Sequence, residues 1–175
     1  HNSGETGTIK ARFVVDASGQ GATLARQLGL RKVDEDFQFM SMWGYFKNSH
    51  FIAPDGLAYP SSMLGTLPPT TFVSNTGGWN WMWHIPLRES TSIGLVLSQS
   101  EMRNVKGMKA MEANFLERLQ QIPVLNRLIE DATFIEDSFH VIRDYSYMPT
   151  ELAGPGFFLI GDAAAFVDPI FSIGV

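Results

Sequence analysis

Phe157-Phe158-Leu159-Ile160-Gly161-Asp162 is the stretch that decides the predicted fold. Its first four residues form a continuous apolar run, which is typical of a buried strand in a parallel sheet. Gly161 and Asp162 follow at once, and Ala163–Val167 opens with residues that favour a helix. A strand, a tight turn and a helix start place free backbone N–H groups and a carboxylate where open α/β sheets bind ligands. Taken alone, Asp162 is more often an ordinary helix N-cap.

A second strand and turn lie near the start of the chain. The β-rich run Ala11–Val15 leads into Asp16-Ala17-Ser18-Gly19, and a short helical pattern with Gly29 as its C-cap follows. Most Asp-x-x-Gly strings are only turns. Gly19 has no side chain, so a ligand could approach the backbone closely there.

The most unusual segment is Gly78-Trp79-Asn80-Trp81-Met82-Trp83-His84-Ile85-Pro86-Leu87, which holds three of the four tryptophans at alternating positions. Alternation is the strand period, so Trp79, Trp81 and Trp83 are predicted on one face, and Pro86 is predicted to end the strand. A row of indoles of this kind is ordinarily core. The neighbouring sequence predicts three further strands, at Phe39–Phe46, Thr71–Val73 and Ser92–Leu97.

The apolar spacing beyond this sheet predicts helices between residues 105 and 131. One apolar stripe is made by Met108, Met111, Phe115, Leu119 and Ile122, and Pro123 stops that first helix. Thr133–Asp144 is predicted to be extended again.

Composition excludes several classes of function. The 175 residues are 45% hydrophobic and 18% charged with a net charge of −5, so nucleic acid and anionic membranes are poor partners. No run approaches the roughly 20 apolar residues of a membrane span. The absence of cysteine fits a cytoplasmic protein. We expect no metal site, because the histidines show no ligand spacing; they are His1, His50, His84 and His140.

Together these motifs resemble one family. Trp81-Met82-Trp83-His84-Ile85-Pro86 reads as W-x-W-x-I-P, the signature of flavin-dependent halogenases. Gly161-Asp162-Ala163-Ala164 through Pro169 is similar to the second FAD fingerprint of the p-hydroxybenzoate-hydroxylase-like flavoproteins. Phe166-x-x-Pro169-x-x-Ser172-x-Gly174 matches a second halogenase signature, whereas the related monooxygenases usually carry the proline one position earlier and a His where Ala165 stands.

The resemblance implies a fold of the α/β (α+β) class. Residues 1–30 and 151–175 would belong to a partial FAD-binding, Rossmann-like domain of the glutathione-reductase type 2. Residues 31–150 would form an inserted substrate domain with an antiparallel sheet and helices. The chain has no G-x-G-x-x-G, so we expect an internal piece of a longer flavoprotein, inactive alone, with that motif and a catalytic lysine upstream of His1.

The resemblance also implies a chemistry. FADH2 supplied by a separate flavin reductase would react with O₂ to a flavin hydroperoxide, and chloride or bromide would attack it to give hypohalous acid. Trp81 and Trp83 would keep the organic substrate away from the flavin, and no side chain is assigned as catalytic. Halide would bind the backbone N–H groups of Ile173 and Gly174. The cofactor-binding residues would be Asp16, Gly19, Gly161, Asp162, Pro169 and Gly174.

The substrate class and two rival functions stay open at this point. Tryptophan-halogenating members carry a Glu where this chain has Phe171, so the substrate is predicted to be a phenol or a pyrrole, free or tethered to a carrier protein. A flavin monooxygenase that hydroxylates aromatic compounds would use the same Asp16, Gly19 and Asp162. A purely structural domain would have tryptophans in its core and Asp162 as a helix cap.

Overall fold

The computed structural model describes residue 4, residues 6–143 and residues 145–171. The chain separates into two compact units. The first unit comprises His1–Phe37 and Tyr145–Val175, and the second comprises Gln38–Asp144. Within the described ranges, no helix is long and apolar enough to cross a membrane.

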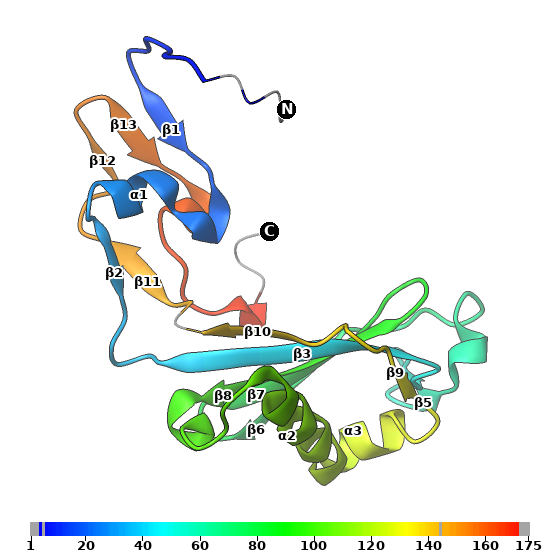
Figure 1. Cartoon of the computed structure of the whole chain (residues 1–175). Coiled ribbons are helices and arrows are strands. Elements are labelled where there is room, and N and C mark those ends of the chain that lie inside the picture. The colour runs from blue at the N-terminus through cyan, green and yellow to red at the C-terminus, as the bar shows by residue number, and fades with distance from the viewer. Residues whose placement is uncertain (1–3, 5, 144, 172–175) are drawn as a thin grey trace. The chain divides into compact units, whose positions relative to one another are not determined.

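The first unit is built on a parallel strand pair. Strand β1 (Val14–Asp16) lies beside β13 (Phe157–Leu159) in parallel, with Asp16 opposite Leu159, so the last strand belongs to a parallel pair as predicted. The predicted burial of that segment is wrong for Phe158 and Ile160, which are 43% and 49% exposed. Strand β12 (Ala153–Gly154) is antiparallel to β13 on its other side. Figure 1 shows these three strands together in blue and orange. Strands β1 and β13, which lie far apart in the sequence, therefore share one sheet.

Helix α1 (Thr23–Gln27) and a two-stranded antiparallel sheet complete this unit. That sheet pairs β2 (Arg31–Val33) with β11 (Tyr147–Pro149). Gly29 follows the helix with a φ of 68°, as predicted for its C-cap, because the left-handed region is readily open only to glycine. A small core holds the pieces together; it contains Ala22, Ala25, Tyr147, Leu159 and Ala164.

The prediction of a helix after Asp162 is wrong. The chain makes a single 3₁₀ turn, η4 (Gly161–Ala163), then runs extended to a second 3₁₀ turn, η5 (Pro169–Phe171). The extended part is held because Phe166 exchanges two backbone hydrogen bonds with Tyr147, of 2.8 and 3.0 Å. Pro169 also disfavours a helical conformation at Asp168. Pairing with a neighbouring segment has therefore overridden the helix propensity of the alanines.

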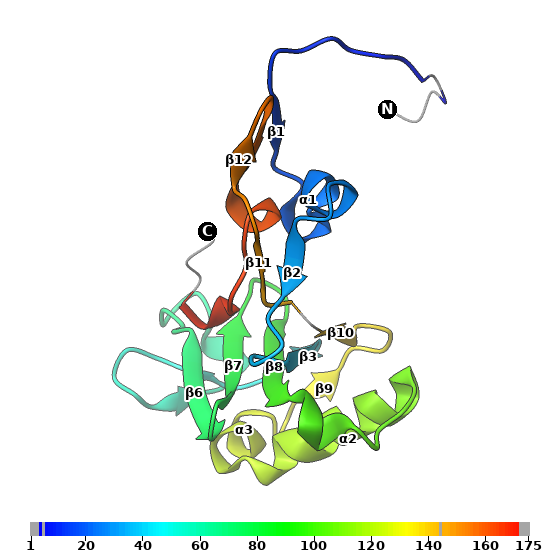
Figure 2. The ribbon, with the colours of Figure 1, turned by 90° about the vertical axis from the view of Figure 1, so that its left-hand side faces the viewer.

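The second unit is an antiparallel sheet. Its strand order is β10-β3-β8-β7-β6, and β9 extends the far end of β3 (Figure 2). The strands are β3 (Phe39–Lys47), β6 (Phe72–Gly77), β7 (Asn80–Pro86), β8 (Thr91–Ser98), β9 (Thr133–Phe134) and β10 (His140–Arg143). The predicted strands are confirmed, including the end of β7 at Pro86.

Two helices cover one face of this sheet. Helix α2 (Met108–Gln121) buries Met111, Phe115 and Leu119, and Pro123 begins α3 (Pro123–Leu128) directly after it. Figure 1 shows both helices on the same side of the sheet. They pack on Met40, Met42, Met82 and other side chains that point to this face. The predicted helical region is confirmed. Its apolar stripe is confirmed at Met111, Phe115 and Leu119, whereas Met108 in the first turn is 55% exposed. A hairpin of β4 (Phe51–Ile52) and β5 (Ala58–Tyr59), with 3₁₀ turns at Ser61–Met63 and Gln99–Met102, completes the unit.

One of the three alternating tryptophans does not lie where the pattern predicted. Trp79 belongs to the turn between β6 and β7 and is 79% exposed, whereas Trp81 is 6% exposed within β7. The prediction of three indoles on one strand face is therefore wrong for Trp79. Gly77 and Gly78, both with positive φ, make the reversal and leave Trp79 in the turn.

His84 lies at the centre of the second unit and is fully buried. Its Nε2 atom is 2.9 Å from Ser49 Oγ, and Ser49 Oγ lies 3.0 Å from the carbonyl oxygens of both His50 and Leu128. The single hydroxyl proton of Ser49 goes to a carbonyl oxygen, so Nε2 of His84 must be the donor to Ser49. Nδ1 is then the bare nitrogen, buried without a partner. Burial lowers the pKa of His84 to about 4.

The lowered pKa of His84 predicts that the fold loses stability in acid. The pKa of His84 is lower in the folded state than the ordinary 6.5, so its contribution is complete above pH 6.5 and is lost as the pH falls towards 4. That difference corresponds to about 3 kcal/mol of unfolding free energy. The unfolding free energy, measured by denaturant titration at several pH values, should fall as the pH decreases from 6.5 to 4. His84→Gln should remove most of this pH dependence. His140→Gln, a change at an exposed histidine, should retain the pH dependence. An equal pH dependence of the unfolding free energy in both variants would contradict the role assigned to His84.

Candidate functional site

The two sequence motifs of the first unit come together at the carboxyl ends of β1 and β13. The 3₁₀ turn η1 (Gly19–Gly21) lies against η4, and Ile160 N donates to Asp16 O at 3.0 Å just before the turns begin. Gly19 has a φ of 62° and Gly161 a φ of 56°. A Cβ atom at either position would meet no atom within 4 Å. The turns require glycine for their backbone conformation, and the space beside them is open.

Asp16 shapes the first of these turns. Its Oδ1 accepts from Ser18 N at 2.9 Å and its Oδ2 accepts from Leu24 N at 2.7 Å, and the residue is buried. A hydrogen bond from the Ser18 hydroxyl, together with the backbone N–H groups of Ser18 and Leu24, lowers the pKa of Asp16 against the opposing effect of burial. The carboxylate thus anchors the start of α1. Direct contact between Asp16 and a cofactor stays a prediction.

Tyr147 braces the second turn and is a residue that the sequence analysis missed. Its hydroxyl donates to the backbone carbonyl of Asp162, its ring carries the Arg31 guanidinium 4.0 Å above it, and its side chain is buried. Burial raises the pKa of Tyr147. In the sequence, Tyr145-Ser146-Tyr147 looks like an ordinary connection back to the last strand, so only the folded chain reveals this role.

The neighbours of Tyr147 hold the segment that follows. Ser146 Oγ donates to Val167 O, and Tyr145 Oη donates to Asp168 Oδ2 at 3.1 Å. Asp168 Oδ1 in turn accepts from Ile170 N at 2.9 Å, which fixes the start of η5. Pro169 is exposed at the head of that turn, and Asp162 is half-buried. Ile173 and Gly174, the predicted halide site, lie outside the described residues. The predicted contact of Gly174 with the cofactor falls outside them as well.

The second unit presents an aromatic face, opposite to the face that the helices cover. Trp81 and Trp83 lie 5.6 Å apart between ring centroids, and Trp83 lies 6.3 Å from Trp43 of β3. Trp43 stacks on His140 of β10 at 5.0 Å, and His140 meets the edge of Tyr45 at 6.3 Å. The predicted tryptophan pair is thus one end of an aromatic row across four strands. The register of the strands, which sequence spacing does not give, brings Trp43 and His140 into it.

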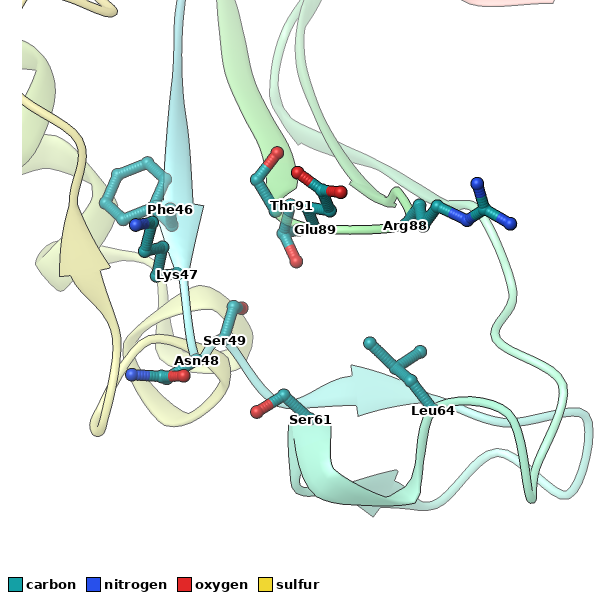
Figure 3. Close-up of a pocket in the computed structure, with 10 residues that line it drawn as sticks. Phe46, Lys47, Asn48, Ser49, Ser61, Leu64, Arg88, Glu89 and Thr91 are labelled. Carbon is teal, nitrogen blue, oxygen red and sulfur yellow. The ribbon is translucent and has the colours of Figure 1, made fainter.

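A polar hollow of about 340 Å³ opens at the far ends of β3 and β8 (Figure 3). It contains none of the predicted site residues. Its lining comes from three loops and includes Lys47, Asn48, Ser49, Ser61, Leu64, Arg88 and Glu89. Nearby, His50 lies 3.6 Å from both Glu130 and Asp131 through its two ring nitrogens. Exposed acidic groups of this kind are common without a metal, and the expectation of no metal site stays a prediction.

Comparisons with known proteins identify the class. The tryptophan 2-halogenase of Chondromyces crocatus is 35% identical over 176 residues, which are 99% of this chain and 31% of that protein. The chlorinase of 1H-pyrrole-2-carbonyl peptidyl-carrier protein from Pseudomonas fluorescens is 38% identical over 95% of this chain and 35% of its own. The chain thus spans about a third of the length of these relatives.

A solved structure agrees with these relatives. CmlS, a flavin-dependent halogenase, superposes with a TM-score of 0.77 at 31% identity, covering 99% of this chain and 29% of CmlS. The fold is therefore that of the flavin-dependent halogenases. The model of the tryptophan halogenase family matches residues 2–175, and the chain belongs to that family.

Tyr147→Phe tests the brace on the Gly161-Asp162 turn. The variant keeps the ring beneath Arg31 but removes the donor to the Asp162 carbonyl, so we expect a loss of about 1 to 2 kcal/mol of unfolding free energy. Tyr59→Phe is the matched control, because its hydroxyl bonds the exposed Asp55 at 2.7 Å and should contribute little. Equal effects of the two substitutions in denaturant titrations would contradict the assigned role.

Proposed function

We propose that the protein halogenates an aromatic substrate, phenolic or pyrrolic, with FADH2, O₂ and chloride or bromide. The observation that carries the proposal is the pair of open glycine turns, Gly19 and Gly161, at adjoining carboxyl ends of parallel strands in a chain of the tryptophan halogenase family. A separate flavin reductase would supply the reduced cofactor, which is consistent with a cytoplasmic enzyme of secondary metabolism.

The residues of the first unit fit FAD. Gly19 and Gly161 have positive φ angles and open space where a side chain would be, so a dinucleotide could approach the backbone of both turns closely with its phosphate and ribityl parts. The half-buried Asp162 carboxylate can accept a hydrogen bond from a ribityl hydroxyl, and Tyr147 fixes the turn that carries it. When bound and reduced, FAD would supply the two electrons that reduce O₂ to the peroxide level, and that oxidant would convert the halide into the halogenating species.

The tryptophans act by exclusion in this proposal. Trp81 is buried and Trp83 is half-buried, and their rings lie side by side on a sheet face without helices. They present bulk and no titratable group, so their role is to keep the substrate from direct reaction at the flavin. The halide is assigned to the backbone N–H groups of Ile173 and Gly174 as a prediction from the motif alone.

The substrate class rests on one position and on the relatives. Phe171 stands where tryptophan-halogenating members are expected to carry a Glu, and a phenol can activate its own ring by losing a proton. Among the relatives, one is named for a pyrrole on a carrier protein, one is a sulochrin halogenase, and one is a tryptophan 2-halogenase. Competition among a phenol, a carrier-bound pyrrole and free tryptophan therefore tests the assignment. Faster turnover of tryptophan would contradict it.

The reaction type has a direct test. The full-length enzyme is incubated with FAD, a flavin reductase, NADH, bromide and a phenol, and the products are identified by mass spectrometry. We expect a brominated phenol, because family membership favours halogenation over the hydroxylase alternative. Oxygenated products with no brominated ones would contradict the proposal.

Asp162→Ala tests the cofactor site separately from the chemistry. Loss of a hydrogen bond to a charged group should weaken FAD affinity about ten- to hundredfold, measured by flavin fluorescence or calorimetry. Asp55→Ala is the matched control, because that carboxylate lies in a turn of the other unit, where it accepts from Leu57 N at 3.0 Å. Unchanged affinity in the Asp162 variant would favour a purely structural turn.

A further inference from the structure

The Trp83 indole occupies the place of a missing side chain on the neighbouring strand. In the register of the sheet, Gly94 of β8 lies between Trp83 of β7 and Trp43 of β3. A Cβ atom at Gly94 would lie 2.2 Å from Trp83 Cζ2, 2.3 Å from Cη2 and 2.5 Å from Cε2. These atoms belong to the six-membered ring of the indole. Trp83 therefore lies across β8 instead of standing above its own strand.

The other edge of the same indole is held by Ser92. Trp83 Nε1 donates to Ser92 Oγ at 3.1 Å, and Ser92 is two residues from Gly94, hence on the same face of β8. The ring is thus fixed at its N–H edge by a hydrogen bond and at its six-membered ring by the space over Gly94. In this position it lies 5.6 Å from Trp81 and 6.3 Å from Trp43, tilted by 42° and 43°.

The glycine is required by the ring and not by the backbone. Gly94 is inside a regular strand, and its φ is outside the positive region that favours glycine. A glycine in a strand interior costs stability, and one explanation is the close approach of another group. Here the approaching group is the half-buried Trp83 ring. Half-burial also leaves part of the ring free to contact another molecule, which a core tryptophan could not do.

We propose that Gly94 and Ser92 are positioning residues, which set the tilt of Trp83 and so the surface that separates substrate from flavin. The separating role rests on the proposed function, whereas the positioning of the ring by these two residues does not. An alanine at position 94 has to expel the indole from its place, because the ring is a side chain that can turn, whereas β8 is paired with a strand on each side. An alanine at position 92 leaves the space but removes the hydrogen bond.

The test uses Gly94→Ala, Ser92→Ala and a control on the opposite face. Gly44→Ala is that control, since its Cβ would lie 2.5 Å from Phe134 Cε2 on the helix-covered side. Closely spaced indoles give an exciton couplet in the far-ultraviolet circular dichroism spectrum, which reads ring geometry directly. Gly94→Ala should abolish the couplet, Ser92→Ala should weaken it, and Gly44→Ala should leave it intact at a similar loss of stability. An unchanged couplet in Gly94→Ala would overturn the proposal, as would an equal change in Gly44→Ala.

Product analysis then separates positioning from function. With a phenol and bromide, Gly94→Ala and Ser92→Ala should raise the ratio of hydroxylated to brominated product, and Gly44→Ala should not. In a Trp83→Ala background, Gly94→Ala should add no further change, because the ring it displaces is absent. A lost couplet with no change of product ratio, in Gly94→Ala and in Trp83→Ala alike, would support the positioning and overturn the separating role of Trp83. Ser92→Ala, which adds no clash, keeps the test open if Gly94→Ala does not fold.

Discussion

The parallel pairing of β1 with β13 is the constraint on which the candidate cofactor site depends. Its register sets Asp16 opposite Leu159, and the hydrogen bond from Ile160 N to Asp16 O fixes that register where the strands end. Because parallel strands end at the same edge of a sheet, the turns at Gly19 and Gly161 must adjoin. A change of register would separate the two turns, whatever residues they contained.

Missing side chains shape the candidate cofactor site of the first unit and, separately, the aromatic face of the second. Gly19 and Gly161 keep space open beside turns whose positive φ angles other residues rarely adopt. Gly94 does the same in an ordinary strand conformation, for a ring of the protein itself. In each case polar groups supply the rigidity that glycine lacks. Asp16 and Tyr147 hold the turns, and Ser92 holds the indole. The chain thus combines open space with fixed walls, which is what preorganised binding requires.

The sequence predicted the elements of the fold well, because their signals are local. Strand alternation, the apolar stripe of α2 and the stop at Pro123 each depend on a few neighbouring residues. The helix expected after Asp162 failed because Phe166 pairs with Tyr147, a partner that lies in another part of the unit. The prediction that Trp79 lies in the strand was wrong because the turn between β6 and β7 includes Trp79, one residue more than the alternation suggested.

The site was predicted less completely, since its supporting residues are joined only by tertiary contacts. Tyr147, Trp43, Ser92 and Gly94 carry no motif. A side-chain hydrogen bond joins Tyr147 to Asp162, and strand register brings the other three residues to Trp83. His84 stands inside the W-x-W-x-I-P motif, yet its partner Ser49 lies in a loop after another strand.

The most direct test of this account is a crystal structure of the protein with FAD bound. We predict that the ribityl and phosphate groups lie over the carboxyl ends of β1 and β13, within hydrogen-bonding distance of the turns at Gly19 and Gly161. FAD bound elsewhere, with these two turns empty, would contradict the assignment of the cofactor site.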